Sequence, residues 1–399
     1  MIWEIDYSAL YNIMKRCILI VVDSLGCGDA PDAIKYNKLG ANTIRNVASK
    51  TNGLNLPTFD ILGLGKVTEV NGFHNKNIIG SYGKMTPQSV NNDSTTGHWE
   101  LAGIVSEKSF SLYPEGFPEE ILTEISEAIN YEFIGNKHAS GTEIIEELGM
   151  EHLNTKKLIL YTSGDSVFQI AAHEDVMTTE ELYRVCKISR TLLDKYRVGR
   201  VIARPFIGNK GEFKRTYDRK DFGMKTPDGN ILELLHENGF KSFGIGKIED
   251  LFGNDYLHKS IHTNGDEDGL MSLINSLETE KFDFTFINLV DCDMLYGHRE
   301  NANGYAQGLD LIDRYLARLL NIVSKNDLVL ITGDHGNDPT DGDTDHTREY
   351  VPIIAYTKNS KGSNLHTRDS FTDVGKTIAE YFEIENTIIG KSFLKDIIK

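Results

Sequence analysis

The 399-residue sequence predicts an α/β protein in which a mainly parallel sheet is covered on both faces by helices and a second domain is inserted. Two observations predict this class. Short apolar runs rich in β-branched residues, typical of strands buried on both faces, alternate with segments of helical apolar spacing. The chain is also longer than one compact core usually requires, so two domains are expected.

The core elements follow one another in a strand–helix alternation. The first strand is expected at 17–22 (Cys-Ile-Leu-Ile-Val-Val) and ends at Asp23. Further strands are expected at 241–246, 284–290, 327–332 and 351–357. Helices are expected at 230–238, which stops at a glycine, and at 308–323, whose apolar residues fall on one stripe. This alternation indicates a parallel sheet with helices on both sides.

The middle of the chain has a different pattern and is expected to form the inserted domain. Helical stretches at 119–129, 142–149 and 179–196 alternate there with strand candidates at 157–162 and 200–207. We therefore expect a discontinuous core domain made of 14–108 and 226–399, and an α+β cap domain over 109–225. Residues 1–13 are expected to be an N-terminal extension.

Composition excludes several classes of partner. The net charge of -17 argues against nucleic-acid or anionic-membrane binding, although a local cluster of cations can still bind a small anion. The four cysteines form no CxxC pair, which fits a reducing compartment. No apolar stretch reaches transmembrane length. We expect a cytoplasmic protein that acts as a monomer, without nucleic-acid or membrane partners.

Metal-binding residue types follow three of the expected core strands. The six candidates are Asp23 after 17–22, Asp293 and His298 after 284–290, and Asp334, His335 and His346 after 327–332. Each one alone could be a helix cap or a solvated loop residue. Together they favour a metal site, because parallel strands bring their carboxyl ends to one edge of the sheet. Carboxylates and imidazoles suit Mn, Zn or Fe, and six ligands suffice for the two-metal sites used in phosphoryl transfer.

A nucleophile candidate lies in the segment Asp93-Ser94-Thr95-Thr96-Gly97. A metal can ionise a hydroxyl and so activate it. The same segment could instead be a helix start capped by Ser94. His98 and Trp99 are unusual after a plain cap, so we favour a functional role.

The order of these residues is that of the alkaline phosphatase superfamily of metal-dependent phosphotransferases. Six longer stretches, from residue 97 to residue 350, resemble one family within it, the phosphopentomutases. They are 97–100 (Gly-His-Trp-Glu), 139–144, 162–167, 169–174, 202–206 and 344–350. The resemblance extends from about residue 15 to the end of the chain.

This resemblance implies an alkaline-phosphatase-like α/β/α core with a cap domain and two Mn²⁺ ions. One ion would be held by Asp293, His298 and His346, and the other by Asp23, Asp334, His335 and the nucleophile. It implies interconversion of α-ribose 1-phosphate, or its 2-deoxy analogue, with the 5-phosphate. The reaction would pass through a phosphoserine enzyme and a bisphosphate intermediate, with a sugar bisphosphate as activator.

The chain departs from the family pattern at the nucleophile. Ser94 stands where the family usually has Thr, and Asn92 stands where it usually has Lys. Ser94 is preferred because it follows the Asp, but Thr95 and Thr96 stay open as alternatives. A phosphatase or another phosphosugar mutase of the same superfamily, and a non-enzymatic metal-binding protein, also remain open.

Substrate contacts are expected from five further residues. Arg204, Arg215 and Lys247 are candidates for binding the second phosphate, since guanidinium groups suit bidentate phosphate contacts. Asp165 and Ser166 are candidates for contacts with the sugar hydroxyls. The alternative for each cation is an ordinary solvated surface charge.

Overall fold

The computed structural model describes residues 15–37, 39–163, 166–358 and 360–398. The expected extension 1–13 and the candidate Asp165 lie outside the described residues. The chain divides into two compact units, one made of Met1–Lys108 with Thr226–Lys399 and the other of Ser109–Lys225.

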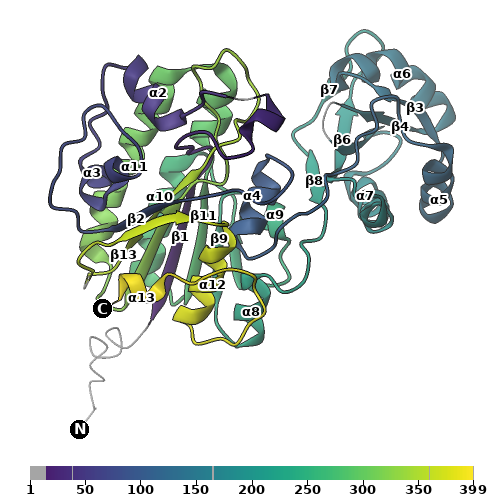
Figure 1. Cartoon of the computed structure of the whole chain (residues 1–399). Helices are drawn as coiled ribbons and strands as arrows, with labels where there is room; N and C mark the ends of the chain where they lie inside the picture. Colours follow the sequence, from purple (N-terminus) through teal and green to yellow (C-terminus); the bar gives the residue numbers. More distant parts are fainter. Residues whose placement is uncertain (1–14, 38, 164–165, 359, 399) are drawn as a thin grey trace. The chain divides into compact units, whose positions relative to one another are not determined.

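The first unit is built on an eight-stranded sheet (Figure 1). Its strands, in spatial order, are β10 (Lys259–Ile261), β9 (Ser242–Ile245), β11 (Phe284–Leu289), β1 (Arg16–Val22), β12 (Asp327–Thr332), β13 (Val351–Tyr356), β2 (Ser81–Met85) and β14 (Asn364–Arg368). The central strand β1 pairs in parallel with β11 on one side and β12 on the other. Every residue of β1 is buried, as its uninterrupted apolar run predicted.

The sheet is not parallel throughout. β13 pairs antiparallel with both β12 and β2. The segment 333–350 that joins β12 to β13 contains no α-helix, so the chain returns without the crossover that a parallel pair needs. All five strands expected for the core are present, whereas β2, β10 and β14 were not predicted because they are short and carry polar residues.

Helices cover both faces of this sheet (Figure 1). One layer consists of α2 (Thr43–Lys50), α3 (Pro57–Leu62), α10 (Asp266–Thr279) and α11 (Ala302–Ile322), whose apolar residues share a core with those of β1 and β11. The other contains α4 (Ser94–Leu101), α8 (Ile231–Glu237), α9 (Ile248–Phe252) and α12 (Thr372–Tyr381), with the short α13 (Leu394–Ile397) beside α12. The expected three-layer core is therefore present.

The second unit has its own mixed sheet and its own core. The strand order is β3 (Phe133–His138), β4 (Leu158–Thr162), β5 (Val167–His173), β6 (Arg200–Ile207) and β7 (Lys214–Arg215), and β8 (Lys220–Gly223) also pairs with β6. Two helices, α5 (Glu119–Ile129) and α7 (Thr179–Leu193), contribute to one apolar core with this sheet, and α6 (Gly141–Thr155) contributes to another. Within the described part of the chain, no helix combines the length and apolar character needed to cross a bilayer.

Candidate metal centre and nucleophile

Three neighbouring strands bring the expected ligands to one edge of the sheet. In the parallel register, Val22 of β1 lies opposite Leu289 of β11, and Val21 lies opposite Thr332 of β12. Asp23 directly follows β1, and Asp334 and His335 come two and three residues after β12. Asp293 lies in the π-helix Cys292–Tyr296, which begins shortly after β11 ends at Leu289. The carboxyl edge is the position at which open α/β sheets bind ligands.

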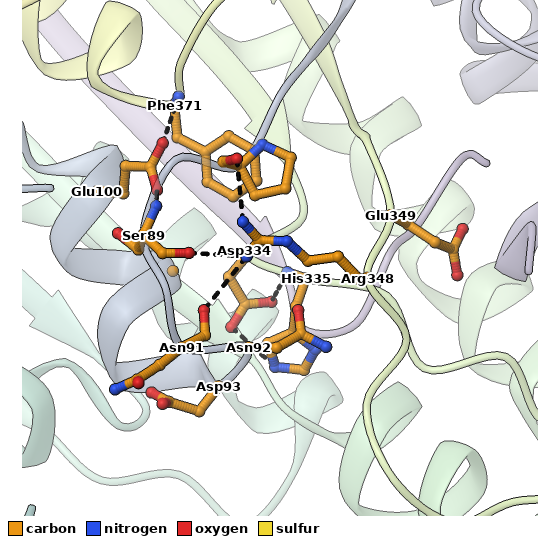
Figure 2. A pocket seen from close by; sticks show the side chains of 12 residues that line it. Ser89, Asn91, Asn92, Asp93, Glu100, Asp334, His335, Arg348, Glu349 and Phe371 are labelled. Atoms are coloured by element: carbon orange, nitrogen blue, oxygen red, sulfur yellow. Dashed lines mark hydrogen bonds and ion pairs between the residues drawn. The ribbon is translucent and has the colours of Figure 1, made fainter. Parts of the chain in front are cut away.

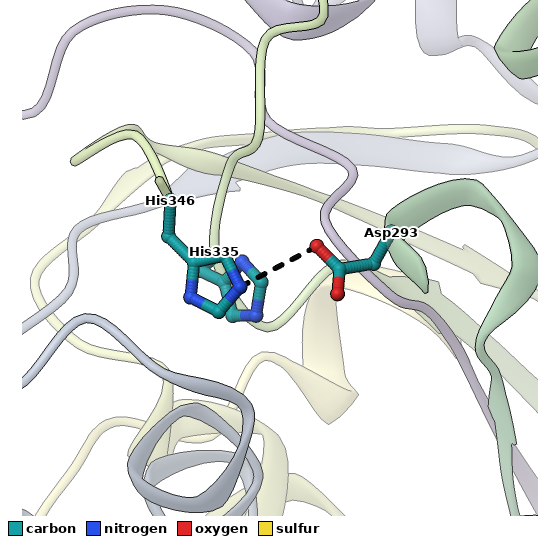
Figure 3. A group of neighbouring side chains, drawn as sticks. All are labelled: Asp293, His335 and His346. Atoms are coloured by element: carbon teal, nitrogen blue, oxygen red, sulfur yellow. Dashed lines mark ion pairs between the residues drawn. The ribbon is translucent and has the colours of Figure 1, made fainter. Parts of the chain in front are cut away.

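Two groups of side chains at this edge have the composition and spacing of metal ligands. Asp23, Asp334 and His335 present ligand atoms within 4.8 Å of one another, and so do Asp293, His335 and His346 (Figure 3). His335 belongs to both groups, and its ring stacks on that of His346 with the centroids 3.8 Å apart. The two groups are therefore adjacent, as a two-metal site requires.

His298 also lies at this edge, close to the second group. Its Nε2 is 3.1 Å from Oδ2 of Asp293 and 3.2 Å from Nε2 of His346. The resemblance assigned His298 to the ion held by Asp293 and His346. The structure brings His335 within ligand distance of that pair as well, so four side chains converge there.

The three imidazoles share one hydrogen-bonding arrangement. Nδ1 lies 2.6 Å from the Thr344 carbonyl in His298, 2.9 Å from the Asn92 carbonyl in His346, and 3.1 Å from the Gly336 carbonyl in His335. A carbonyl oxygen only accepts, so each neutral ring carries its proton on Nδ1 and directs the lone pair of Nε2 at the carboxylates. A backbone carbonyl behind the ring is the usual support for a metal-binding histidine.

The carboxylates are buried together, which disfavours their joint ionisation without a cation. Burial, together with the neighbouring Asp334 and Asp293, raises the pKa of Asp23 to about 6, although His335 and Lys247 act in the opposite direction. Burial acts in the same direction on Asp334, but His335 and His98 hold the pKa of Asp334 at about 2. Burial raises the pKa of Asp293, but His298, His346 and His335 favour its ionised form when they carry a proton on Nε2, and together they hold that pKa below its usual range.

The site residues fit a divalent metal ion. Among the described residues, the buried Oδ2 of Asp334 has no hydrogen-bond partner. The nearest donor, Nδ1 of His98, is 3.1 Å away but is directed at the Ser94 carbonyl at 2.8 Å. An unpartnered buried carboxylate oxygen is costly unless a cation meets it. Three carboxylates with imidazole nitrogens form a donor set that suits Mn or Zn.

Ser94 is the first residue of α4, and its hydroxyl faces the first ligand group. Its Oγ lies 3.1 Å from Nε2 of His335 and 3.4 Å from Oδ1 of Asp23. The helix start is capped by Asp93, whose carboxylate accepts from the amide of Thr96 at 2.9 Å. A helix start at this point was one of the two interpretations, but the cap is Asp93, which leaves the Ser94 side chain available.

The neighbouring hydroxyls differ from Ser94. Thr96 is buried, and its hydroxyl lies 3.4 Å from the Asp93 carbonyl. The contacts of this segment thus favour Ser94 over Thr96 as the nucleophile. Trp99, in contrast, is a core residue whose indole donates to the Leu251 carbonyl at 2.9 Å.

Several supporting residues were not predicted from the sequence. Asn288 donates to Asp23 Oδ2 at 3.1 Å, and Asn337 donates to Asp293 Oδ1 at 2.8 Å. Both amides are buried, and each binds one oxygen of a candidate ligand carboxylate. No spacing signal marks them, because their roles arise only when separate strands meet. A small cavity beside α4 is lined by Asp93, Asp334 and other residues shown in Figure 2.

The expected substrate-binding residues have distinct surroundings. Lys247 directly precedes α9 in the first unit, and its charge partly opposes the rise in the pKa of the Asp23 carboxyl. In the second unit, burial raises the pKa of the Tyr161 phenol, and the nearby guanidinium groups of Arg204 and Arg215 both oppose that rise. The Ser166 hydroxyl donates to the Ser111 carbonyl at 2.5 Å and accepts from the Gly199 amide at 3.0 Å.

Comparisons with known proteins agree with the resemblance seen in the sequence. Residues 15–386 match the family model described as the Metalloenzyme superfamily. Phosphopentomutase of Caldanaerobacter subterraneus subsp. tengcongensis is 48% identical over 96% of this chain and 98% of its own. Phosphopentomutase of Dictyoglomus turgidum is 49% identical over 97% of this chain and 99% of its own. The predicted family and fold class are confirmed, and the chain belongs to the phosphopentomutase family of the Metalloenzyme superfamily.

Proposed function

We propose that this chain is a phosphopentomutase that interconverts α-ribose 1-phosphate, or its 2-deoxy analogue, with the corresponding 5-phosphate. The observation that carries the proposal is the position of the Ser94 hydroxyl, 3.1 Å from His335 and 3.4 Å from Asp23 at a buried group of metal-type ligands. A nucleophile in that position suits transfer of a phosphoryl group to and from the enzyme.

The cofactors in this proposal are two Mn²⁺ ions, whose preference for carboxylate and imidazole ligands agrees with the donor set. Asp23, Asp334 and His335 would hold one, and Asp293, His298 and His346 the other. When bound, the ions neutralise charge on the transferring phosphoryl group and on the Ser94 oxygen. The start of α4 adds to this, because its free backbone amides favour an anion at Ser94.

The proposed reaction moves one phosphoryl group to the substrate and takes the other back. Phosphorylated Ser94 donates its phosphoryl group to the free hydroxyl of the pentose phosphate; the Ser94 O–P bond breaks, and the hydroxyl proton passes to the Ser94 oxygen. The resulting bisphosphate reorients in the site. The Ser94 hydroxyl then attacks its other phosphate, and the isomeric monophosphate leaves. A sugar bisphosphate primes the enzyme by phosphorylating Ser94.

The substrate contacts complete the proposal. Arg204, Arg215 and Lys247 bind the phosphate that is not being transferred, and Asp165 with Ser166 contacts the sugar hydroxyls. The Arg204–Arg215 pair beside the Tyr161 phenol supports the first assignment, because two guanidinium groups that share surroundings suit a dianion. Four buried cysteines without a disulfide support the proposed cytoplasmic location.

The test follows α-ribose 1-phosphate by ³¹P NMR in the presence of Mn²⁺ and a catalytic amount of pentose bisphosphate. We expect ribose 5-phosphate to form without release of inorganic phosphate. Release of inorganic phosphate in step with substrate loss would identify a phosphatase of the same superfamily instead. Ser94→Ala should abolish turnover and keep its metal, whereas a non-enzymatic metal-binding protein would show no turnover in either form.

A further inference from the structure

We propose that Arg348 and Glu100 are positioning residues for the phosphoryl transfer. Together they fix residues 87–92, here called the nucleophile loop, which leads into Ser94 and supports the candidate ligand His346. The inference rests on the proposed function and adds residues to it that contact neither substrate nor metal in the proposal.

Arg348 is a buried cation whose five N–H groups are all used. Its Nε and Nη2 donate to the Asp32 carboxylate at 3.0 and 3.1 Å. The remaining donors go to carbonyls of the nucleophile loop, at 2.8 Å for Ser89, 3.3 Å for Asn91 and 3.1 Å for Pro87 (Figure 2). The planar fork of a guanidinium group can hold three carbonyls in fixed directions, and a lysine ammonium cannot.

Glu100 is a buried anion that holds the amides of the same loop. Its carboxylate accepts from the amide of Gln88 at 2.9 Å and from that of Ser89 at 2.7 Å. It also accepts from the Ser370 hydroxyl at 2.9 Å and from the Phe371 amide at 3.1 Å, at the start of α12. Glu100 lies on α4, the helix that begins with Ser94. The helix and the loop before it are therefore tied together through this one carboxylate.

The far end of the nucleophile loop reaches the metal centre. The Asn92 carbonyl accepts from Nδ1 of His346 at 2.9 Å, and the next residue, Asp93, caps α4. Between Ser89 and Asn91, whose carbonyls Arg348 binds, the Val90 carbonyl accepts from the Tyr36 hydroxyl at 2.8 Å. A displacement of the loop would thus move both the Ser94 backbone and the support behind the His346 ring.

A contribution to stability alone does not explain well why the charges of Arg348 and Glu100 are buried. A buried ion pair often contributes little net stability, because desolvation offsets the attraction. The chain offers a matched comparison in Arg16, which makes the same two-pronged contact with Asp327, at 3.0 and 2.6 Å, where β1 and β12 begin. Arg16 lies at the edge of the sheet opposite to the site, whereas Arg348 holds the nucleophile loop.

The test compares Arg348→Lys with Arg16→Lys, because both changes keep the charge and remove the fork. Misplacement of reacting groups by about 1 Å lowers rates on the order of 10²-fold. We expect Arg348→Lys to lower kcat by about that factor, with KM changed less than ~3-fold, and to weaken Mn²⁺ binding measured by calorimetry. Arg16→Lys should lower the melting temperature and leave the kcat of the folded protein near that of the unchanged chain.

Equal kcat in the two lysine variants, with only their melting temperatures lowered, would overturn the inference, since both arginines would then be structural. Glu100→Gln provides a second variant of nearly the same shape. It keeps one accepting oxygen and replaces the other by an NH₂ donor, so it cannot accept from the loop amides and from the Phe371 amide together. The same fall in kcat is expected. Absence of mutase activity in the unchanged chain would defeat the proposed function instead. The Mn²⁺ affinity of the variants would still test the positioning role in that case.

Discussion

At the scale of single residues, the protonation of Asp23 makes metal binding depend on pH. Burial beside Asp334 and Asp293 raises the pKa of Asp23 to about 6 in the metal-free protein. A metal can bind this carboxylate only after its proton leaves, so binding should weaken as the pH falls through about 6. We expect protonation of Asp23 to lower the Mn²⁺ affinity by up to ~10-fold per pH unit below that point. This adds to the loss caused by protonation of His298 and His335, whose pKa values the neighbouring carboxylates raise. Calorimetric titrations between pH 5 and 8 check this, and a flat affinity would contradict it.

The same carboxylate should cost stability when no metal is bound. The pKa of Asp23 is higher in the folded chain than in the unfolded one, so its contribution to stability is greatest at low pH and is lost as the pH rises through about 6. Asp23→Asn should therefore raise the free energy of unfolding at pH 8 by on the order of 2 kcal/mol after chelation, with little change at pH 4. Chemical denaturation at the two pH values measures the difference. A loss of stability at pH 8 in this variant would show that the ionised Asp23 carboxylate is stabilised by its surroundings in the metal-free protein, which contradicts the prediction.

At the scale of elements, the contact between α4 and the loop after β12 places the nucleophile. A Cβ on Gly97 would lie 2.3 Å from the Asp334 carbonyl oxygen, which is backbone and cannot move aside. Gly97→Ala should push α4 away from Asp334 and lower both kcat and Mn²⁺ affinity by ~10-fold or more.

Gly269 is the matched control for this change, because it also lies in a helix, α10, and its added Cβ would meet Ile287 at an ordinary 3.5 Å. Gly269→Ala should leave kcat unchanged and keep or raise the melting temperature, since alanine favours a helix over glycine. A Gly97→Ala variant that behaves like Gly269→Ala would show that the close approach of α4 is not needed for the reaction.

The elements that could be predicted from the sequence are those with a long, regular apolar pattern. The buried strand at 17–22 is continuous and apolar, and it appears as β1 over Arg16–Val22. The stripe at 308–323 marked only part of α11, which begins at Ala302, because the first turn carries small and polar residues. The antiparallel direction of β13 could not be predicted, since it depends on the path of 333–350 rather than on the strand itself.

At the scale of the whole molecule, the proposed reaction needs cationic groups that lie far from Ser94 in sequence. Arg204→Ala and Arg215→Ala should each raise KM for the pentose phosphate by ~10-fold or more, because each removes a charged hydrogen-bonding partner of the phosphate. Arg314, on the exposed side of α11, provides a control in Arg314→Ala, whose KM should not change. Steady-state kinetics decide the point, and an unchanged KM in both cap variants would remove them from the substrate site.

The chemistry of the site was predictable further than its support. The six ligand candidates could be found because each follows a strong strand or lies in the loop after one, and the parallel strands β11, β1 and β12 bring them together. The buried groups Glu100, Asn337 and Arg348 were not predicted to have a role. Their partners are separated from them by up to hundreds of residues, so only the folded chain shows what each one holds.

The location of the phosphoryl group on the enzyme tests the proposed phosphoserine mechanism most directly. The chain is incubated with Mn²⁺ and a pentose bisphosphate, digested, and the peptide that contains residues 93–97 is sequenced by mass spectrometry. We expect one phosphoryl group on Ser94, which disappears when ribose 5-phosphate is added and reappears in a sugar bisphosphate. A phosphoryl group on Thr95 or Thr96, or turnover of the pentose phosphate without any phosphorylated peptide, would contradict it.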